Sequence, residues 1–442
     1  MKLFSSLILT LFVLGCSFDN KSGIWNNENN PRQNFKKNLF ADFKSLSSKN
    51  RSFNKTIPIK DGDIVYFSPQ IKNNSWNDIF YDQTNNTLNF QYNNSNKLIY
   101  KSKKLTRGST GNYLLLNNDN VILNTEKGDI IFYSLNNNKI INKFNFYKKK
   151  FKKIPKKLNF IVENNIVYIS DNLGYLYSFD YISNKVLWAK NYKIPFRSNL
   201  KLSENKLIAA NQNNVLYFFD KNNGDILNLI PTEETNVKNQ FRNNISTSLN
   251  QTFFLNTYGS LYAVNNQTMK ISWFINLNQS NNLNPSNLFL GNHLVNYMDK
   301  IIVSSNNFSY VLNKNNGQII SKKNFSSFIK PTVNNYNIFW ITKNNLLIAY
   351  NLKSEKIIYS YDLDKMISDF LKIKKKKAEF MSIIIAGNKI NIFLNNSYVL
   401  KLNSNGELID VIKLPTKIKS HPTFYKNKLI YLNKKNKIFI IN

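Results

Sequence analysis

Cysteine, histidine and acidic residues are scarce in this chain of 442 residues, and each shortage excludes a kind of chemistry. Cys16 is the only cysteine, so no disulfide can form within the chain and a thiolate metal site is excluded. The two histidines, His293 and His421, lie far apart, and we interpret each as a loop or surface residue. The 26 aspartates and glutamates are spread along the chain. We therefore expect no catalytic residue, no metal and no cofactor.

The apolar stretch at the start of the chain is too short to cross a membrane. It runs from residue 3 to residue 14, whereas a spanning helix needs about twenty apolar residues. Lys2 precedes it and Gly15 follows it, a pattern typical of a cleavable signal peptide over residues 1–15. The cysteine after Gly15 resembles the lipidation site of bacterial lipoproteins, in which the thiol of the equivalent of Cys16 is acylated. The alternative is an ordinary signal peptide with an incidental cysteine.

The next stretch, residues 16–56, is rich in Asn, Ser and Lys and has no sustained alternation. We interpret it as a flexible linker that separates a lipid anchor from the folded part, residues 57–442. Ser17, rather than Asp, after the cysteine agrees with sorting to the outer membrane. The expected location is therefore the periplasmic side of the outer membrane, with the membrane contacted through the acyl anchor.

Basic residues far outnumber acidic ones, with 60 Lys and Arg and a formal net charge of +34. An exported protein does not meet cellular nucleic acid, and the basic residues form no single stretch, so we expect no nucleic-acid partner. Two lysine-rich runs stand out, at 148–153 and 374–377. We interpret them as solvated loops. The alternative is attraction to anionic lipid headgroups or to an acidic partner, worth about 1 kcal/mol per Lys near a charged membrane.

A repeat governs the chain from residue 121 onward. Its clearest copy has an apolar strand at 166–170, a turn, an aromatic strand at 175–180 that ends in Asp180, and a third strand that reaches Trp188. The Asp or Asn that ends the aromatic strand recurs about every 44 residues, at Asn136, Asp180, Asp220, Asn265, Asn313, Asn351, Asn403 and Asn442. Its side chain should accept hydrogen bonds from turn amides. Tyr177, Tyr217, Tyr262, Trp188 and Trp273 should pack between neighbouring repeats.

This period and the short alternating strands predict an all-β fold, an eight-bladed β-propeller. The chain stops in the middle, aromatic strand of its last repeat, without the outermost strand, and a matching lone strand lies at 97–102. We expect this early strand to complete the last blade, because an open ring would expose strand edges. A seven-bladed ring would require the weak repeat around 390–402 to be discarded. Residues 57–92 should pack on the outside or bottom of the ring.

The repeat resembles that of propellers named after pyrroloquinoline-quinone enzymes, best at Asp180 to Trp188 and Asp220 to Leu227. With the lipidation motif and the shared blade, the whole chain resembles the BamB family, lipoproteins of the machine that inserts β-barrels into the bacterial outer membrane. The resemblance implies a non-enzymatic scaffold that docks on the periplasmic domains of the barrel subunit, BamA. Contact with unfolded outer-membrane proteins, by strand addition to a blade edge, stays open.

The family docks through an apolar residue followed by Arg in the long loop after the third blade. Here that loop is 230–246, and Phe241 and Arg242 stand at the matching place. The acidic residues of a neighbouring family loop have no counterpart in 279–292. Two alternatives remain. One is a propeller that binds another envelope protein or cell-wall polysaccharide. The other is a quinone-dependent dehydrogenase, which the few carboxylates and the lone cysteine disfavour.

Overall fold

The computed structural model describes residues 16–18, 25–27, 52–234, 243–278, 293–305 and 307–442. The chain divides into two compact units, residues 1–51 and 52–442. In the first unit, β1 (Cys16–Phe18) pairs antiparallel with β2 (Trp25–Asn27).

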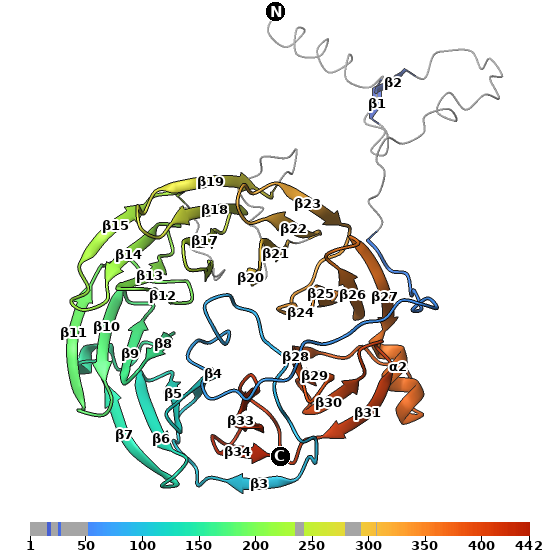
Figure 1. The fold of residues 1–442 in the computed structure, drawn as a ribbon. Helices are drawn as coiled ribbons and strands as arrows, with labels where there is room; N and C mark the ends of the chain where they lie inside the picture. Colours follow the sequence, from blue (N-terminus) through green and yellow to red (C-terminus); the bar gives the residue numbers. More distant parts are fainter. Residues whose placement is uncertain (1–15, 19–24, 28–51, 235–242, 279–292, 306) are drawn as a thin grey trace, which may run out of the picture. The chain divides into compact units, whose positions relative to one another are not determined.

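The described residues of the second unit form eight four-stranded antiparallel sheets, the blades of a β-propeller (Figure 1). In each blade the strands follow one another from the centre of the ring to its rim. This arrangement confirms the predicted all-β class and the number of blades, so the seven-bladed alternative is wrong.

From the centre outward, blades 1 to 4 contain, in turn, β4 (Thr110–Asn117), β5 (Asn120–Thr125), β6 (Asp129–Ser134) and β7 (Lys139–Asn145); β8 (Asn159–Glu163), β9 (Ile166–Ser170), β10 (Tyr175–Asp180) and β11 (Lys185–Asn191); β12 (Lys201–Ser203), β13 (Lys206–Ala210), β14 (Leu216–Asp220) and β15 (Ile226–Ile230); and β16 (Asn244–Thr247), β17 (Gln251–Leu255), β18 (Ser260–Asn265) and β19 (Ile271–Asn276).

Blades 5 to 8 contain, in turn, β20 (Val295–Tyr297), β21 (Lys300–Ser304), β22 (Ser309–Asn313) and β23 (Ile319–Lys323); β24 (Thr332–Asn334), β25 (Asn337–Ile341), β26 (Leu346–Asn351) and β27 (Lys356–Asp362); β28 (Phe380–Ala386), β29 (Lys389–Leu394), β30 (Tyr398–Leu402) and β31 (Leu408–Lys413); and β32 (Thr423–Tyr425), β33 (Lys428–Leu432), β34 (Ile438–Ile441) and β3 (Leu98–Lys101). Two helical segments lie between blades, the 3₁₀ turn η1 (Lys149–Phe151) and the helix α2 (Leu363–Leu371).

The turn after the third strand of a blade is built by the residue that ends that strand. Asp180 Oδ1 accepts hydrogen bonds from the amides of Ile182 (2.9 Å) and Ser183 (3.1 Å). In four other blades, the backbone amide two positions later likewise donates to the side-chain oxygen of the strand-ending residue: Asp220, Asn265, Asn313 and Asn351. The predicted role of these residues is therefore confirmed at five positions. Asn403 differs, because it accepts from the amide of Glu407, four positions on.

Aromatic side chains close the interfaces between blades. The ring of Trp188, on β11, lies against Gly224 of blade 3, and its Nε1 donates to the carbonyl oxygen of Lys221 (2.9 Å). Gly224 has a φ of +78°, and a Cβ there would lie 2.7 Å from the indole ring. Equivalent contacts join Trp273 to Gly317 and Tyr359 to Gly406. The predicted packing of Trp188 and Trp273 between blades is confirmed.

The ring is closed by strands from two distant parts of the chain. β3 pairs antiparallel with β34, with Leu98 opposite Ile441 and Lys101 opposite Phe439. Four strands thus complete blade 8, so its third strand does not end as an open edge. The predicted closing strand is confirmed.

Residues 71–92, here called the axial segment, lie at the centre of the ring rather than outside or beneath it (Figure 1). The segment closes on itself, since the amides of Ile71 and Gln91 donate to the carbonyl oxygens of Asn89 and Ile71 (both 2.8 Å). Our prediction of its position was therefore wrong. The physical reason is that the innermost strands leave backbone groups facing the axis, and these need hydrogen-bond partners.

Candidate functional site: the connection face and the axial channel

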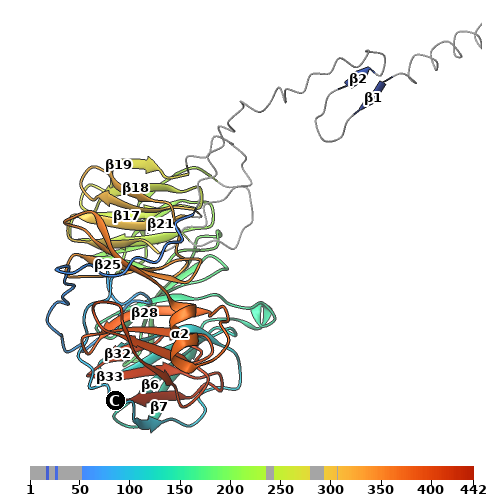
Figure 2. The same ribbon diagram turned by 90° about the vertical axis from the view of Figure 1, so that its right-hand side faces the viewer.

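The meander gives the ring two different faces. Because the strands of a blade alternate in direction, the hairpins that join the first to the second strand and the third to the fourth lie on one face, here called the hairpin face. The hairpins between second and third strands, and the connections from one blade to the next, lie on the opposite face, here called the connection face. Figure 2 shows the ring from the side, with the connection 146–158 in teal projecting from one side.

The predicted docking residues Phe241 and Arg242 lie outside the described residues, as does the loop 279–292. Both loops connect blades, so the described residues that flank them belong to the connection face. The flanking residues of 235–242 show how the loop is attached.

The chain that enters this loop is fixed by Glu233. Its carboxylate accepts hydrogen bonds from Ser260 Oγ (2.6 Å), Tyr262 OH (2.8 Å) and Asn256 Nδ2 (2.7 Å), all in blade 4. Burial opposes ionisation of this carboxyl, but the hydrogen bonds prevail and lower its pKa. Glu233 therefore ties the end of blade 3 to blade 4 as a charged acceptor.

Both ends of the loop are held by one hairpin of blade 3. On the entering side, Thr232 Oγ1 donates to the carbonyl oxygen of Asn214 (2.6 Å). On the leaving side, Asn243 Nδ2 donates to the carbonyl oxygen of Asn211 (2.8 Å). The backbone N–H of Asn243 donates to the carbonyl oxygen of Arg197 (3.0 Å). Asn243 is buried. The described residues on both sides of 235–242 are thus firmly anchored to blade 3.

The axial segment bonds to the innermost strand of every blade. In the order of the blades, its partners are Leu116, Val162, Lys201, Thr247, Asn296, Val333, Ile385 and Phe424. Asn85 is fully buried, and its Nδ2 donates to the carbonyl oxygens of Ile245 (2.9 Å) and Leu294 (2.7 Å), in blade 4 and next to blade 5. This role was not predicted from the sequence, although an Asn-rich stretch that contains Trp76 and Phe80 was a signal.

A buried ion pair lies between the axial segment and blade 3. Lys201 Nζ donates to Asp78 Oδ2 (2.7 Å), to the carbonyl oxygen of Asp82 (2.7 Å) and to Asn85 Oδ1 (2.6 Å). The Lys201 and Asp78 side chains are 0% and 3% exposed. Burial raises the pKa of Asp78, and the attraction of Lys201 opposes it. Lys330 Nζ donates to the carbonyl oxygen of Asn85 (2.7 Å), and burial lowers its pKa to about 8.

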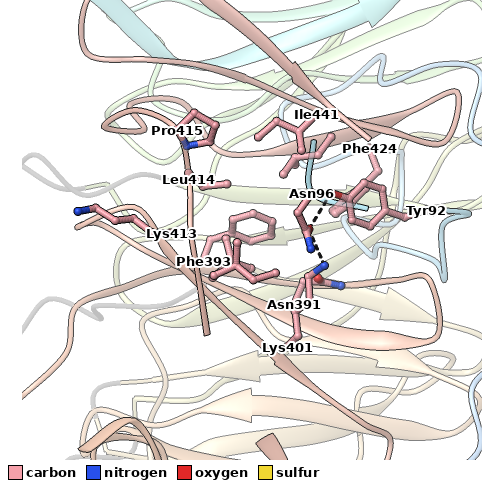
Figure 3. A pocket seen from close by; sticks show the side chains of 13 residues that line it. Tyr92, Asn96, Asn391, Phe393, Lys401, Lys413, Leu414, Pro415, Phe424 and Ile441 are labelled. Carbon is pink, nitrogen blue, oxygen red and sulfur yellow. Dashed lines mark hydrogen bonds between the residues drawn. The ribbon is translucent and has the colours of Figure 1, made fainter. Parts of the chain in front are cut away.

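A small cavity of about 20 Å³ lies between blades 7 and 8, with room for about one water molecule (Figure 3). Lys401, which is buried, donates from Nζ to Asn96 Oδ1 (2.7 Å) and Asn94 Oδ1 (2.9 Å). Tyr92 OH donates to the same Asn96 oxygen (3.3 Å). Burial lowers the pKa of Lys401 to about 8. These contacts fasten the chain that leads from the axial segment into β3.

Cys16 lies in β1, with its backbone opposite Asn27. Within the described ranges, no helix is long and apolar enough to cross a membrane.

Comparisons with known proteins agree with this architecture. The family model described as "Outer membrane protein assembly factor BamB" matches residues 126–361. Among solved structures, BamB from Moraxella catarrhalis superposes with a TM-score of 0.61 at 13% identity, covering 78% of this chain and 99% of that one. No curated protein sequence matches the chain.

Two enzymes share the fold at 10% identity. Quinohemoprotein alcohol dehydrogenase from Comamonas testosteroni has a TM-score of 0.58, covering 83% of this chain and 80% of that one. A europium-containing methanol dehydrogenase has a TM-score of 0.59, covering 83% and 89%. Likeness at this identity shows the fold alone. The family model, in contrast, spans more than half of the chain, and so the chain belongs to the BamB family of outer membrane protein assembly factors.

Proposed function

We propose that this protein is a non-enzymatic scaffold lipoprotein of the machinery that assembles β-barrels in the outer membrane, and that it docks on the periplasmic domains of a BamA-like barrel subunit. The family match supports this proposal, since it covers the loop that carries Phe241 and Arg242. The observation that carries it is the attachment of that loop, at both ends, to one hairpin of blade 3. A rigid base lowers the entropy cost of presenting a binding loop.

The docking pair gives the direct test. Replacing Phe241 and Arg242 with Ala should weaken binding to the barrel subunit's periplasmic domains by at least about 2 kcal/mol, because an apolar anchor beside a guanidinium is typical of a binding hot spot. A pull-down with these domains measures the loss. The matched control is Phe274→Ala with Lys270→Ala, an exposed Phe and Lys on the outer part of blade 4.

Folding must be followed in the same experiment. Neither double variant should change the melting temperature much, whereas Trp188→Ala should cost about 3–5 kcal/mol of stability through lost packing. Full binding by the Phe241/Arg242 variant would refute the docking assignment. Affinity isolation from solubilised membranes separates this role from that of a propeller that binds another envelope protein or polysaccharide, because barrel-assembly subunits should co-purify.

We also propose that Cys16 carries the acyl anchor and that residues 1–15 are removed. Cys16→Ala should abolish incorporation of labelled palmitate and leave an uncleaved or mislocalised precursor. Metabolic labelling followed by membrane fractionation measures both effects. Unchanged labelling and membrane fractionation in the variant would show that Cys16 is not the acylated residue.

The second candidate is a quinone-dependent dehydrogenase, favoured by the fold likeness to the two enzymes. Such an enzyme needs carboxylates that hold a metal beside the quinone and a catalytic aspartate. Here the axial segment fills the centre of the ring, and its Asp78 is bonded to Lys201. Within the described part of the chain, no three His, Cys, Asp or Glu side chains gather at one place. These residues do not fit the cofactor.

A further inference from the structure

Lysine residues from separate parts of the chain gather on one side of the connection face. The seven segments concerned are the connections 363–379, 414–421, 102–109 and 146–158 and the hairpins 395–397, 433–437 and 126–128. They run from the end of blade 6 through blades 7, 8 and 1 to the start of blade 2. We call them the basic arc.

Hydrogen bonds join the segments of the basic arc into one continuous surface. The amide of Asn395 donates to the carbonyl oxygen of Glu379 (2.9 Å), and that of Leu414 donates to Ser397 (2.9 Å). The remaining links are also hydrogen bonds from a backbone amide to a backbone carbonyl oxygen. With the donor first, they are Lys434 to Lys417 (2.9 Å), Leu105 to Asn436 (3.0 Å), Glu126 to Ser109 (2.9 Å) and Lys156 to Glu126 (2.8 Å). The arc is therefore contiguous and does not depend on mobile side chains for its shape.

The charge of the basic arc is strongly one-sided. Its segments contain 22 Lys and Arg residues and only four acidic residues, Asp364, Asp369, Glu126 and Glu379. Among the described lysine and arginine side chains of the arc, only Lys375 forms an ion pair, with Asp362 (2.5 Å). On the hairpin face, by contrast, several lysines are paired, as in Lys426–Asp119, Lys221–Glu163 and Lys300–Asp299. Acidic side chains thus compensate part of the positive charge on the hairpin face, whereas the described lysines of the basic arc are almost all without ion pairs.

Apolar side chains stand exposed among these lysines. After α2, the chain turns at Lys372, which has a φ of +53°, and leads directly into Lys374 to Lys377. The side chains of Phe370, Leu371 and Ile373 are 45%, 37% and 54% exposed. Ile154, next to the lysines of η1, is 41% exposed. Apolar side chains beside lysines are typical of protein surfaces that lie on the headgroup region of a membrane.

We propose that the basic arc binds the surface of an anionic phospholipid membrane. Two observations favour a membrane over an acidic protein. The charge is spread over four blade connections rather than gathered at a pocket, which complements a diffuse layer of headgroups. The exposed Phe, Leu and Ile side chains would also be buried on a membrane, because they can enter the boundary between headgroups and acyl chains. This surface shares no residue with the loop 235–242, and membrane binding by the arc requires neither the partner nor the acyl anchor.

Vesicle co-sedimentation tests the proposal. Residues 52–442, which are compact as a unit and lack the lipidation site, should bind vesicles of phosphatidylglycerol and phosphatidylethanolamine but not vesicles of phosphatidylcholine. Salt at about 1 M should abolish binding, since the Debye length falls to about 3 Å. In the arc variant, six exposed lysines become Gln: Lys149, Lys152, Lys153, Lys374, Lys376 and Lys377. Its partition onto the anionic vesicles should fall at least about tenfold.

A charge-matched control separates the arc from overall charge. The control variant replaces six exposed lysines of the hairpin face with Gln: Lys72, Lys139, Lys185, Lys270, Lys353 and Lys356. It should keep vesicle binding within about twofold of the wild type, because these side chains face away from the arc. Equal losses in the two variants, or no binding of the wild type to anionic vesicles, would overturn the proposal.

Binding to the barrel subunit's periplasmic domains is measured on the same proteins. The arc variant should retain it, and the Phe241/Arg242 variant should retain vesicle binding even if the docking assignment fails. If the arc variant no longer binds the periplasmic domains but still binds the vesicles, the arc is a surface for an acidic protein. That result would refute the membrane assignment.

Discussion

Lysine has three different roles in this molecule, and its surroundings decide between them. Lys201 is fully buried and paired with Asp78, so both charges are compensated. Lys401 is buried, and its Nζ donates to the side-chain amide oxygens of Asn94 and Asn96. The lysines of the basic arc are mostly exposed. The sequence predicted only the last of these, as solvated runs, because burial of a lysine depends on distant residues that it meets in the fold.

The environment of Lys401 predicts a pH dependence of stability. Burial lowers its pKa from 10.5 to about 8, so between these values the unfolded chain binds more protons than the folded one. The free energy of unfolding should therefore rise from about pH 8 to pH 10.5, by at most about 3 kcal/mol from this group. Urea unfolding of the wild type and of Lys401→Met over this range measures the difference between the two slopes. Parallel pH profiles would contradict the prediction.

At the scale of the element, the sequence predicted well wherever a residue acts within its own repeat. Asp180 and its counterparts build turns from their own neighbouring amides, so their spacing alone revealed the blades. The contact of Trp188 with Gly224 was also predictable, because the next blade supplies the same turn about 40 residues later. In blade 6, Tyr359 stands in place of this Trp and was not identified from the sequence. Its ring packs against the glycine of the next blade and its hydroxyl donates to a backbone carbonyl oxygen, as the Trp does, but the Trp that marks the repeat is absent.

At the scale of the whole molecule, closure of the ring was predictable and the filling of its centre was not. The lone strand β3 is a short stretch rich in apolar residues, as its partner β34 is, and the last repeat lacked an outer strand. The axial segment has no period, because each of its residues meets a different blade. The basic arc was hidden for a similar reason, since its seven segments come together only when the ring closes.

The axial segment should hold the blades together through its buried ion pair. Lys201→Met leaves Asp78, the carbonyl oxygen of Asp82 and Asn85 Oδ1 without their shared donor. The expected loss is about 3–5 kcal/mol in the free energy of unfolding, because a buried carboxylate remains uncompensated. Adding Asp78→Asn should recover much of this loss, since it removes the charge while its side-chain oxygen can still accept from the Phe80 amide. Urea unfolding of the single and double variants measures both effects. A single variant as stable as the wild type would mean that this pair does not fasten the axial segment to blade 3.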